Sequence, residues 1–352
     1  MTRVALLGAA GLVGGEFVRL AHSHPQLELS YLGGHRHAGQ RLSSVHPGLR
    51  LSPDPLIENA SPAHVARRCD VIVCATPAEV SASLIPQLAR HGAVVIDLSG
   101  AFRLRADSDH ERWYPGVHRP DGLTEHFTFG LPELIPEEIA RAHLLSLPGC
   151  YATAITLSLA PLVLATELKL GPVLIDAKGS SSGGGLTLRE ADLHPFRSNT
   201  VTPYAPAGHR HAAEVFQLLA DRAPGRVRRM GMSAYGTSGV RGLLVSCYTF
   251  VDEPVDEAAL RRTYLRFCRQ HRFVRYRHRG ETALPVPNAK AVVGSNYCDV
   301  TALYDQDCGR IIALGALDNL VKGAAGQAVQ AINLRLGLGE STGLDAQPLV
   351  VS

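Results

Sequence analysis

The N-terminal part of the chain alternates short apolar runs with helical patterns, and this alternation limits the possible folds more than any other feature. The expected strands cover residues 4–7, 27–32, 71–75 and 93–96. The expected helices between them cover residues 14–22 and 79–91. Strands that alternate with helices form parallel sheets with helices on both faces. This part is therefore predicted to be a doubly wound parallel α/β sheet.

A glycine-rich turn follows the first expected strand. Residues 8–14 read Gly-Ala-Ala-Gly-Leu-Val-Gly, a GxxGxxG spacing directly before a helix. Glycines there permit a tight turn and let the backbone approach a pyrophosphate at the helix N-terminus, as in Rossmann-type dinucleotide sites. The residues predicted to bind the cofactor in this turn are Gly8, Ala10, Gly11, Leu12, Val13 and Gly14. The alternative is a turn that serves packing alone.

The end of the second expected strand indicates which dinucleotide binds. NAD sites usually place an acidic residue there, whereas residues 33–37 read Gly-Gly-His-Arg-His, without a carboxylate. Arg36, helped by His35 or His37, suits the 2′-phosphate of NADP, because a guanidinium forms charge-assisted hydrogen bonds with phosphate. NADPH is therefore the expected cofactor, and a solvated basic loop is the alternative.

The pattern changes after residue 150. A strand is expected over residues 173–177, and later strands over 242–251, 297–304 and 310–317 are longer and alternate, as in an antiparallel sheet with one covered face. We therefore expect a separate α+β domain with a largely antiparallel sheet, whose strands pair subunits into a homo-oligomer, a dimer or a tetramer. A last helix, from residue 318 to about 338, is expected to return to the first domain. The predicted domains are 1–149, 150–317 and 318–352.

One thiol stands where an expected strand gives way to a helix. Residues 148–153 read Pro-Gly-Cys-Tyr-Ala-Thr, between an apolar run ending at Leu147 and a helix expected from Ala152 to about Leu164. Backbone N–H groups at a helix start lack intrahelical partners and the helix dipole is positive there, so a thiolate is favoured. Cys150 is therefore a candidate nucleophile. A buried structural cysteine is the alternative.

A nucleophilic cysteine needs a proton partner, and the best candidates lie in Gly-His-Arg-His over residues 208–211. His209 or His211 is expected to act as the general acid and base, and Arg210 to bind a substrate anion. A metal site and a surface loop are the alternatives, and metal is not expected, because no Cys, Asp or Glu ligand is recognised nearby.

A second candidate for anion binding follows the expected strand at 93–96. Residues 97–104 read Asp-Leu-Ser-Gly-Ala-Phe-Arg-Leu, which places Arg103 just beyond a strand's carboxyl end, where α/β proteins bind ligands. The alternative is that Arg103 only pairs with Asp97.

Composition narrows the setting. The 352 residues contain 45% hydrophobic residues, enough to bury two cores, and no run approaches the ~18 apolar residues of a membrane span. Seven cysteines without a CxxC pair argue against disulfides and structural zinc. A net charge of +3 is too small to imply nucleic acid. A cytoplasmic protein that binds neither nucleic acid nor membrane is expected.

These segments together resemble a known family. They are the glycine turn, Asp97 to Leu104, the Pro-Gly-Cys-Tyr-Ala-Thr run, Gly-His-Arg-His, and Leu-Asp-Asn-Leu-Val-Lys-Gly-Ala-Ala-Gly-Gln-Ala from residue 317. In these five segments the chain resembles the N-acetyl-gamma-glutamyl-phosphate reductases of arginine biosynthesis. The resemblance implies NADPH-dependent reduction of an acyl phosphate to a semialdehyde. It also implies Cys150 as nucleophile, His209 or His211 as acid and base, Asn319 near the nicotinamide and Arg103 near the substrate anion.

Two departures point to a particular branch. The loop after the strand at 173–177 reads Gly-Ser-Ser-Ser-Gly-Gly-Gly over residues 179–185 and lacks the arginine usual in the arginine pathway. With the segments around residues 194–211 it is similar to the lysine-pathway LysW-aminoadipate 6-phosphate reductases, whose substrate is carried on a small acidic carrier protein. Ser182 in this loop is a candidate substrate contact. Asp97 to Leu104 also lacks the aspartate that commonly stands at position 101.

An acidic carrier requires a basic docking surface. Residues 261–280 contain eight arginines and no acid, with four aromatic residues interleaved. This composition suits an acidic protein partner. The alternatives are a solvated helix and strand whose aromatic side chains face the core, or a nucleic-acid contact.

The implied reaction begins when Cys150 attacks the acyl phosphate, which expels phosphate and leaves a thioester. NADPH reduces the thioester, one of the two histidines protonates the resulting oxyanion, and the adduct collapses to the aldehyde. Competing functions are the arginine-pathway reductase, aspartate-semialdehyde dehydrogenase, and a non-catalytic NADPH-binding sensor that keeps the fold.

Overall fold

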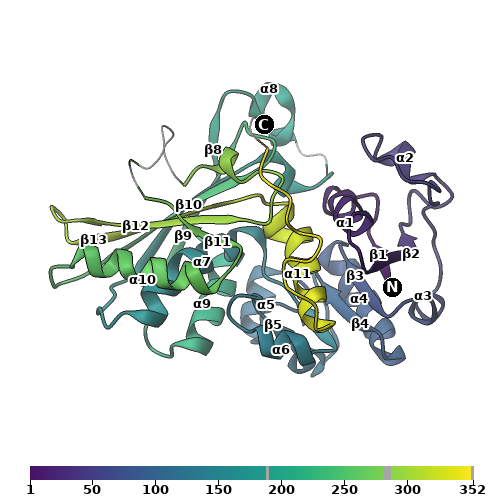
Figure 1. The fold of residues 1–352 in the computed structure, drawn as a ribbon, viewed down its shortest axis with the longest axis horizontal. Coiled ribbons are helices and arrows are strands. Elements are labelled where there is room, and N and C mark those ends of the chain that lie inside the picture. Colours follow the sequence, from purple (N-terminus) through teal and green to yellow (C-terminus); the bar gives the residue numbers. More distant parts are fainter. Residues whose placement is uncertain (188–189, 279, 281–286, 350–352) are drawn as a thin grey trace. The chain divides into compact units, whose positions relative to one another are not determined.

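The computed structural model describes residues 1–187, 190–278, 280 and 287–349 (Figure 1). The chain divides into two compact units. The first comprises residues 1–149 and 324–345, and the second comprises residues 150–323 and 346–352. In the described part of the chain, no helix has both the length and the apolar character needed to cross a membrane.

The first unit is built around a parallel sheet. Its strands are β1 (Thr2–Leu7), β2 (Leu27–Gly33), β3 (Val71–Cys74), β4 (Val94–Asp97), β5 (Phe127–Phe129) and β6 (Leu144–Ser146). They lie in the order β2-β1-β3-β4-β6-β5, and every neighbouring pair is parallel. All residues of β3 and β4 are buried, as expected for central strands covered on both faces. The predicted doubly wound sheet is confirmed.

Helices of the first unit connect and cover these strands. They are α1 (Leu12–His22), α2 (Leu42–Val45), α3 (Pro62–Arg68), α4 (Ala78–Leu88), α5 (Asp107–Trp113), α6 (Pro136–Arg141) and α11 (Gly326–Arg335). Helix α11 comes from the far end of the chain and packs against α1 and α6. The side chain of Asn333 in α11 bonds the ring of His24 through Oδ1 and the carbonyls of Glu340 and Thr342 through Nδ2. These contacts fasten the C-terminal segment to this unit.

The second unit contains a seven-stranded mixed sheet. Its strands are β7 (Val173–Gly179), β8 (Val201–Ala205), β9 (Met230–Thr237), β10 (Leu243–Phe250), β11 (Val274–Tyr276), β12 (Cys298–Asp305) and β13 (Arg310–Leu317). They lie in the order β11-β12-β13-β10-β7-β9-β8. Only the β7–β9 and β11–β12 pairs are parallel. The predicted largely antiparallel sheet is confirmed.

Helices cover one face of this sheet (Figure 1). They are α7 (Cys150–Ala165), α9 (Arg210–Arg222) and α10 (Glu257–Gln270), while the short α8 (His194–Arg197) precedes β8. Helix α7 is apolar around its whole circumference and almost entirely buried, because it packs against β10, β12, β13, α9 and α10. A Cβ on Gly315 of β13 would lie 2.0 Å from the hydroxyl oxygen of Ser158, so glycine permits this close packing.

Two sequence expectations about elements need correction. The single helix expected from residue 318 to about 338 is a turn, a π-helical segment (Val321–Ala325) and then α11, which ends at Arg335. Strands β5, β8, β9 and β11 were not expected. Three of them are short or rich in glycine, proline or polar residues, and their pairing with neighbouring strands, not their own sequence, makes them strands.

Candidate active site

The glycine turn of the first unit combines a tight backbone with an open helix end. Gly8 has a φ of +89°, and a Cβ there would lie 2.4 Å from the carbonyl oxygen of Ala75. A Cβ on Gly14 would lie 2.3 Å from the carbonyl oxygen of Gly8. The fold itself therefore requires these two glycines. A Cβ on Gly11 would meet only the Gly8 carbonyl oxygen, at 3.4 Å. Packing within the protein therefore does not require a glycine at position 11.

Gly11 is the N-cap of α1, and no side chain caps that helix. Ala10 precedes it, and Leu12 and Val13 form the first helical turn, all of them partly exposed. Backbone N–H groups at such a helix start are ready donors to an anion. The turn therefore fits a dinucleotide pyrophosphate, and Gly11 is the position where a missing side chain leaves room for it.

Two of the three basic residues after β2 are exposed. His35 and Arg36 both lie on the surface, and the Nδ1 of His35 is 3.3 Å from the side-chain amide nitrogen of Asn59. The ring of His37 is 3.2 Å from the side-chain oxygen of Gln40. This arrangement keeps a guanidinium at the carboxyl end of β2, the position at which Rossmann-type sites read the ribose of the dinucleotide.

Cys150 is the first residue of α7 and is partly exposed, which argues against a buried structural cysteine. Four of the other six cysteines are buried: Cys69, Cys74, Cys247 and Cys298. Gly323 of the π-helical segment packs against Cys150. A Cβ on Gly323 would lie 2.5 Å from the Cβ of Cys150 and 3.0 Å from its Cα. The thiol thus stands at a helix start whose backbone is held from the side by a glycine far along the chain.

Both histidines of Gly-His-Arg-His lie around the residue after Cys150. The ring of Tyr151 has its centroid 5.7 Å from that of His209 and 6.0 Å from that of His211. The two imidazole centroids are 4.8 Å apart. The hydroxyl of Tyr204 in β8 is 3.4 Å from Nε2 of His209. The structure thus places both rings beside Tyr151, the residue that follows Cys150, and their role as acid and base stays a prediction.

The two rings differ in their hydrogen bonds. His209 is the N-cap of α9, and its Nδ1 accepts the backbone N–H of His211 at 3.3 Å. Burial, with His211 and Arg210 close by, lowers the pKa of His209 to about 3. The Nδ1 of His211 is 2.9 Å from a carboxylate oxygen of Glu214, and both side chains are buried. Glu214, three residues after His211, is thus an acidic neighbour of this motif that sequence reasoning did not recognise.

Asn319 joins two loops of the second unit. Its side-chain oxygen accepts from the Ser180 hydroxyl at 3.0 Å and from the Gly242 backbone N–H at 2.8 Å. Its amide nitrogen donates to the hydroxyl of Ser182 at 2.9 Å. Asn319 therefore fixes the altered serine and glycine loop, which holds the candidate substrate residue Ser182.

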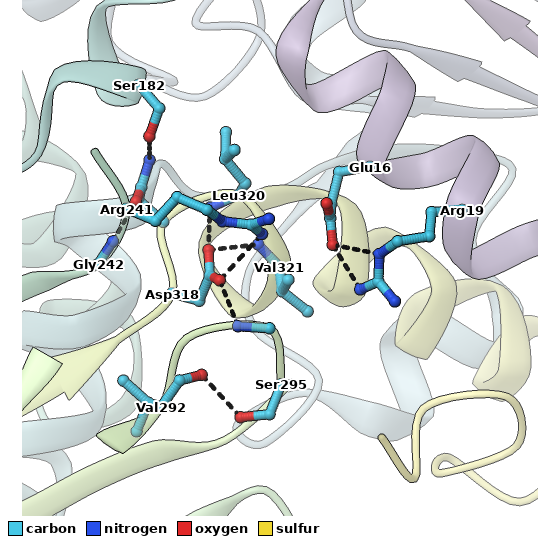
Figure 2. A network of polar contacts seen from close by, with 12 residues as sticks. Glu16, Arg19, Ser182, Arg241, Gly242, Val292, Ser295, Asp318, Leu320 and Val321 are labelled. Carbon is cyan, nitrogen blue, oxygen red and sulfur yellow. Dashed lines mark hydrogen bonds and ion pairs between the residues drawn. The ribbon is translucent and has the colours of Figure 1, made fainter. Parts of the chain in front are cut away.

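The neighbouring Asp318 is buried. Figure 2 shows its carboxylate bonded to the turn at Leu320 and Val321. Its Oδ1 accepts the backbone N–H groups of Leu320 and Val321 at 2.9 and 3.3 Å. Its Oδ2 accepts the N–H of Gly294 at 2.7 Å and forms an ion pair with Arg241 at 2.9 Å. Sequence reasoning missed Asp318 and Arg241 because their partners are 24 and 77 residues away from the aspartate.

The two candidate anion-binding arginines differ in burial. Arg103 is buried, and its guanidinium donates to the carbonyl oxygens of Leu147 at 2.8 Å and Leu98 at 2.7 Å. Asp97 accepts from the backbone and hydroxyl of Ser99 at 2.9 and 3.0 Å. Arg103 therefore braces the ends of two strands, and its contact with a substrate stays a prediction. Arg210 opens α9 and is exposed.

The arginine-rich run has two parts. Arg275 and Arg277 donate to the two carboxylate oxygens of the fully buried Asp299 at 2.6 and 3.0 Å, so they stabilise the β11–β12 pair. Side chains of Tyr264, Phe267 and Phe273 are buried in the core. The exposed arginines are Arg261, Arg262, Arg266, Arg269 and Arg272. Arg279 lies outside the described residues.

Two family models match most of the chain. The semialdehyde dehydrogenase NAD binding domain matches residues 3–142, and the semialdehyde dehydrogenase dimerisation domain matches residues 150–319. The chain belongs to the semialdehyde dehydrogenase family. It is therefore an oxidoreductase with a nicotinamide dinucleotide domain.

Curated relatives span almost the whole chain. A LysW-L-2-aminoadipate/LysW-L-glutamate phosphate reductase of Saccharolobus solfataricus is 37% identical over 347 residues, covering 99% of this chain and 98% of the relative. An N-acetyl-gamma-glutamyl-phosphate reductase of Methanopyrus kandleri is also 37% identical over 347 residues, covering 98% of each. The relatives thus include both kinds of reductase that the sequence resemblance names.

Solved structures confirm the fold. Aspartate semialdehyde dehydrogenase II of Vibrio cholerae superposes with a TM-score of 0.72 at 16% identity, covering 96% of this chain and 98% of that one. The Candida albicans enzyme, solved with NADP, gives a TM-score of 0.71 at 15% identity, covering 95% and 98%.

Proposed function

We propose that the chain is an NADPH-dependent reductase that converts a carrier-linked acyl phosphate, L-2-aminoadipate 6-phosphate carried on a LysW-like protein, into its semialdehyde. The observation that carries the proposal is the partly exposed Cys150 at the first residue of a buried helix, with His209 and His211 around the adjoining Tyr151. Lysine-pathway relatives and the serine and glycine loop support the carrier-linked substrate.

Each residue has a definite task in this reaction. Cys150 attacks the acyl carbon, the bond to phosphate breaks, and the acyl group remains as a thioester. Backbone N–H groups at the start of α7 stabilise the oxyanion, and one of the two histidines supplies its proton. Ser182, Arg103 and Arg210 are the proposed substrate contacts.

The first unit holds the cofactor in this proposal. The turn at Gly8, Gly11 and Gly14 with the start of α1 binds the pyrophosphate, and Arg36 with His35 binds the 2′-phosphate. Bound NADPH supplies the hydride that reduces the thioester. Asn319 is proposed to lie near the nicotinamide. Its amide nitrogen donates to the Ser182 hydroxyl and so positions the loop that contains Ser182.

An acidic carrier protein is the proposed partner, because the relatives' names include a LysW-carried substrate. The exposed arginines of α10 support a docking surface there: Arg261, Arg262, Arg266 and Arg269. Opposite charge speeds association more than it strengthens the final complex. The seven free cysteines and the biosynthetic relatives support a cytoplasmic location.

The chain is proposed to form a homo-oligomer through the second unit. The sheet face opposite α7, α9 and α10 carries apolar side chains, including Leu174 at 50% and Phe250 at 45% exposure. Leu174 pairs with the half-buried Tyr248 across β7 and β10, so these side chains share that face. An exposed apolar face of this kind marks a protein interface. Sedimentation equilibrium of the wild type and of Leu174→Lys tests it, and a monomeric wild type would contradict it.

Turnover measurements decide among the candidate functions. N-acetylglutamyl phosphate, aspartyl phosphate, and aminoadipyl and glutamyl phosphates linked to the carrier are each offered with NADPH and with NADH. We expect fast turnover only with the carrier-linked substrates and NADPH. Efficient reduction of free N-acetylglutamyl phosphate would assign the chain to the arginine pathway. Tight NADPH binding without turnover of any acyl phosphate would favour a sensor.

A further inference from the structure

Glu214 is a buried acid that the proposed reaction has not used. It lies in the first turns of α9, its side chain is fully buried, and it meets Nδ1 of His211 at 2.9 Å. Burying a carboxylate without a hydrogen-bond partner raises the free energy of the folded state. The bond to His211 offsets this cost for Glu214. The spacing of three residues places both side chains on one face of the helix.

The contact determines which nitrogen of His211 carries the proton. An ionised carboxylate can only accept, so Nδ1 of His211 donates to Glu214, and the neutral ring has its lone pair at Nε2. A carboxylate beside imidazole also favours the protonated ring, because it compensates the positive charge. His211 can therefore accept and return a proton at Nε2 without losing its bond to Glu214.

The neighbouring His209 is arranged in the opposite way. Its Nδ1 accepts the backbone N–H of His211, so its proton is at Nε2, which faces the Tyr204 hydroxyl. Burial and the nearby Arg210 and His211 hold the pKa of this ring far below its ordinary value. His209 is thus neutral at physiological pH and is suited to donate a hydrogen bond, not to take up a proton.

We infer that His211 is the group that transfers the proton, that Glu214 is its positioning residue, and that His209 is a neutral N–H donor. The inference rests on the proposed function and deepens it. After the thioester carbonyl has been reduced, the Nε2 proton of His211 passes to the oxyanion. The proton then returns to Nε2 as the C–S bond breaks, so Cys150 leaves as thiolate and the aldehyde is released.

The charged and titratable groups around His211 come from three elements. On α9 they are Glu214, His209 and Arg210. From α7 come Tyr151, whose ring meets His211 edge-on, and the adjoining Cys150. From β8 comes Tyr204, which contacts His209. Of these groups only Glu214 is a carboxylic acid, so its replacement removes the one carboxylate in this set.

The test compares Glu214→Gln, Glu214→Asp and His209→Gln with the wild type in pH profiles of kcat for the preferred acyl phosphate. Glu214→Gln should lower kcat by about a hundredfold and move the alkaline limb of the profile about one unit or more to lower pH, because the imidazolium loses its counter-charge. Glu214→Asp should restore part of both. His209→Gln should lower kcat and leave the limb in place. Asp221→Asn, an exposed acid on the same helix, is the matched control and should change neither.

Two results would overturn the inference. One is a Glu214→Gln enzyme with a lower kcat whose alkaline limb lies at the same pH as in the wild type. A purely structural role of Glu214 would lower kcat at every pH without moving the limb. The other is a limb that disappears in His209→Gln, which would make His209 the proton-transfer group. Circular dichroism and NADPH binding verify that each variant is folded. Failure of the proposed function is seen separately, as a wild type that turns over none of the acyl phosphates.

Discussion

The cofactor turn of the first unit and the thiol site of the second unit are built in different ways. The turn consists of seven consecutive residues, 8–14, and its key property is missing side chains. The thiol site draws on α7, α9, β8 and the π-helical segment at residues 321–325. A binding site made from backbone can be local in sequence. The thiol site instead needs side chains from separate elements, because Cys150 lies on α7, Tyr204 on β8 and the two histidines at the start of α9.

The largest loss of activity is expected at Cys150, because no backbone group can replace its thiol. Cys150→Ser should lower reduction by at least about a thousandfold, because serine forms no comparable thioester, while NADPH binding stays unchanged. Steady-state turnover and fluorescence titration with NADPH measure the two. Cys308→Ser, an exposed cysteine outside the site, is the control. Substantial turnover by Cys150→Ser would remove Cys150 as the nucleophile.

The cofactor region should respond through affinity. Arg36→Ala should raise the KM for NADPH by about 10- to 150-fold relative to NADH, because a hydrogen bond to a charged group contributes about 1.5–3 kcal/mol. Arg50→Ala, an exposed arginine of the same unit, should change neither KM. Equal effects of Arg36→Ala on both cofactors would place the 2′-phosphate elsewhere.

A substitution at Gly11 distinguishes a glycine turn that binds the cofactor from one that serves packing alone. Gly11→Ala should leave the melting temperature nearly unchanged, since its Cβ meets only one atom of the chain. It should weaken NADPH binding by about tenfold if the pyrophosphate lies against this backbone, the equivalent of one lost charge-assisted hydrogen bond. Gly48→Ala, where a Cβ meets nothing within 4 Å, is the control. Unchanged affinity would favour a turn that serves packing alone.

The smallest effect is expected at the carrier surface. Arg266→Glu with Arg269→Glu should lower kcat/KM for carrier-linked substrate by about three- to tenfold at low salt and flatten its salt dependence. Free acyl phosphates should be little affected. Arg90→Glu with Arg228→Glu gives the same charge change on exposed residues elsewhere. Equal losses in both double variants would exclude a specific docking surface on α10.

Arg275 shows why the structure was needed to design that experiment. The sequence places it among eight arginines of a single basic run, and charge reversal there is a natural choice. In the structure it is bonded to the fully buried Asp299, so reversal would leave that carboxylate unpaired and opposed by a like charge. The loss would measure folding, not docking.

The sequence led to the proposed roles of Gly8, Gly14, Cys150 and the two histidines, because each of these residues belongs to a short motif that can be recognised from its neighbours. Glu214 could have been found as well, since a His and a Glu three residues apart share a helix face. The parallel, doubly wound character of the first sheet also followed from local patterns, because strands that alternate with helices form parallel sheets. The order of its strands came only from the structure.

By itself, the sequence determined the two-part fold and the glycine turn, and it led to the proposals that Cys150 is the nucleophile and that the motif of His209 and His211 carries the proton. Only the tertiary structure decided that Gly323 packs on Cys150, that Asn319 holds the Ser180 and Ser182 loop, and that Arg275 is bound to Asp299. These contacts join residues 24 to 173 positions apart. Such pairings depend on how strands and helices pack, and a side chain shows its partner only after the chain has folded.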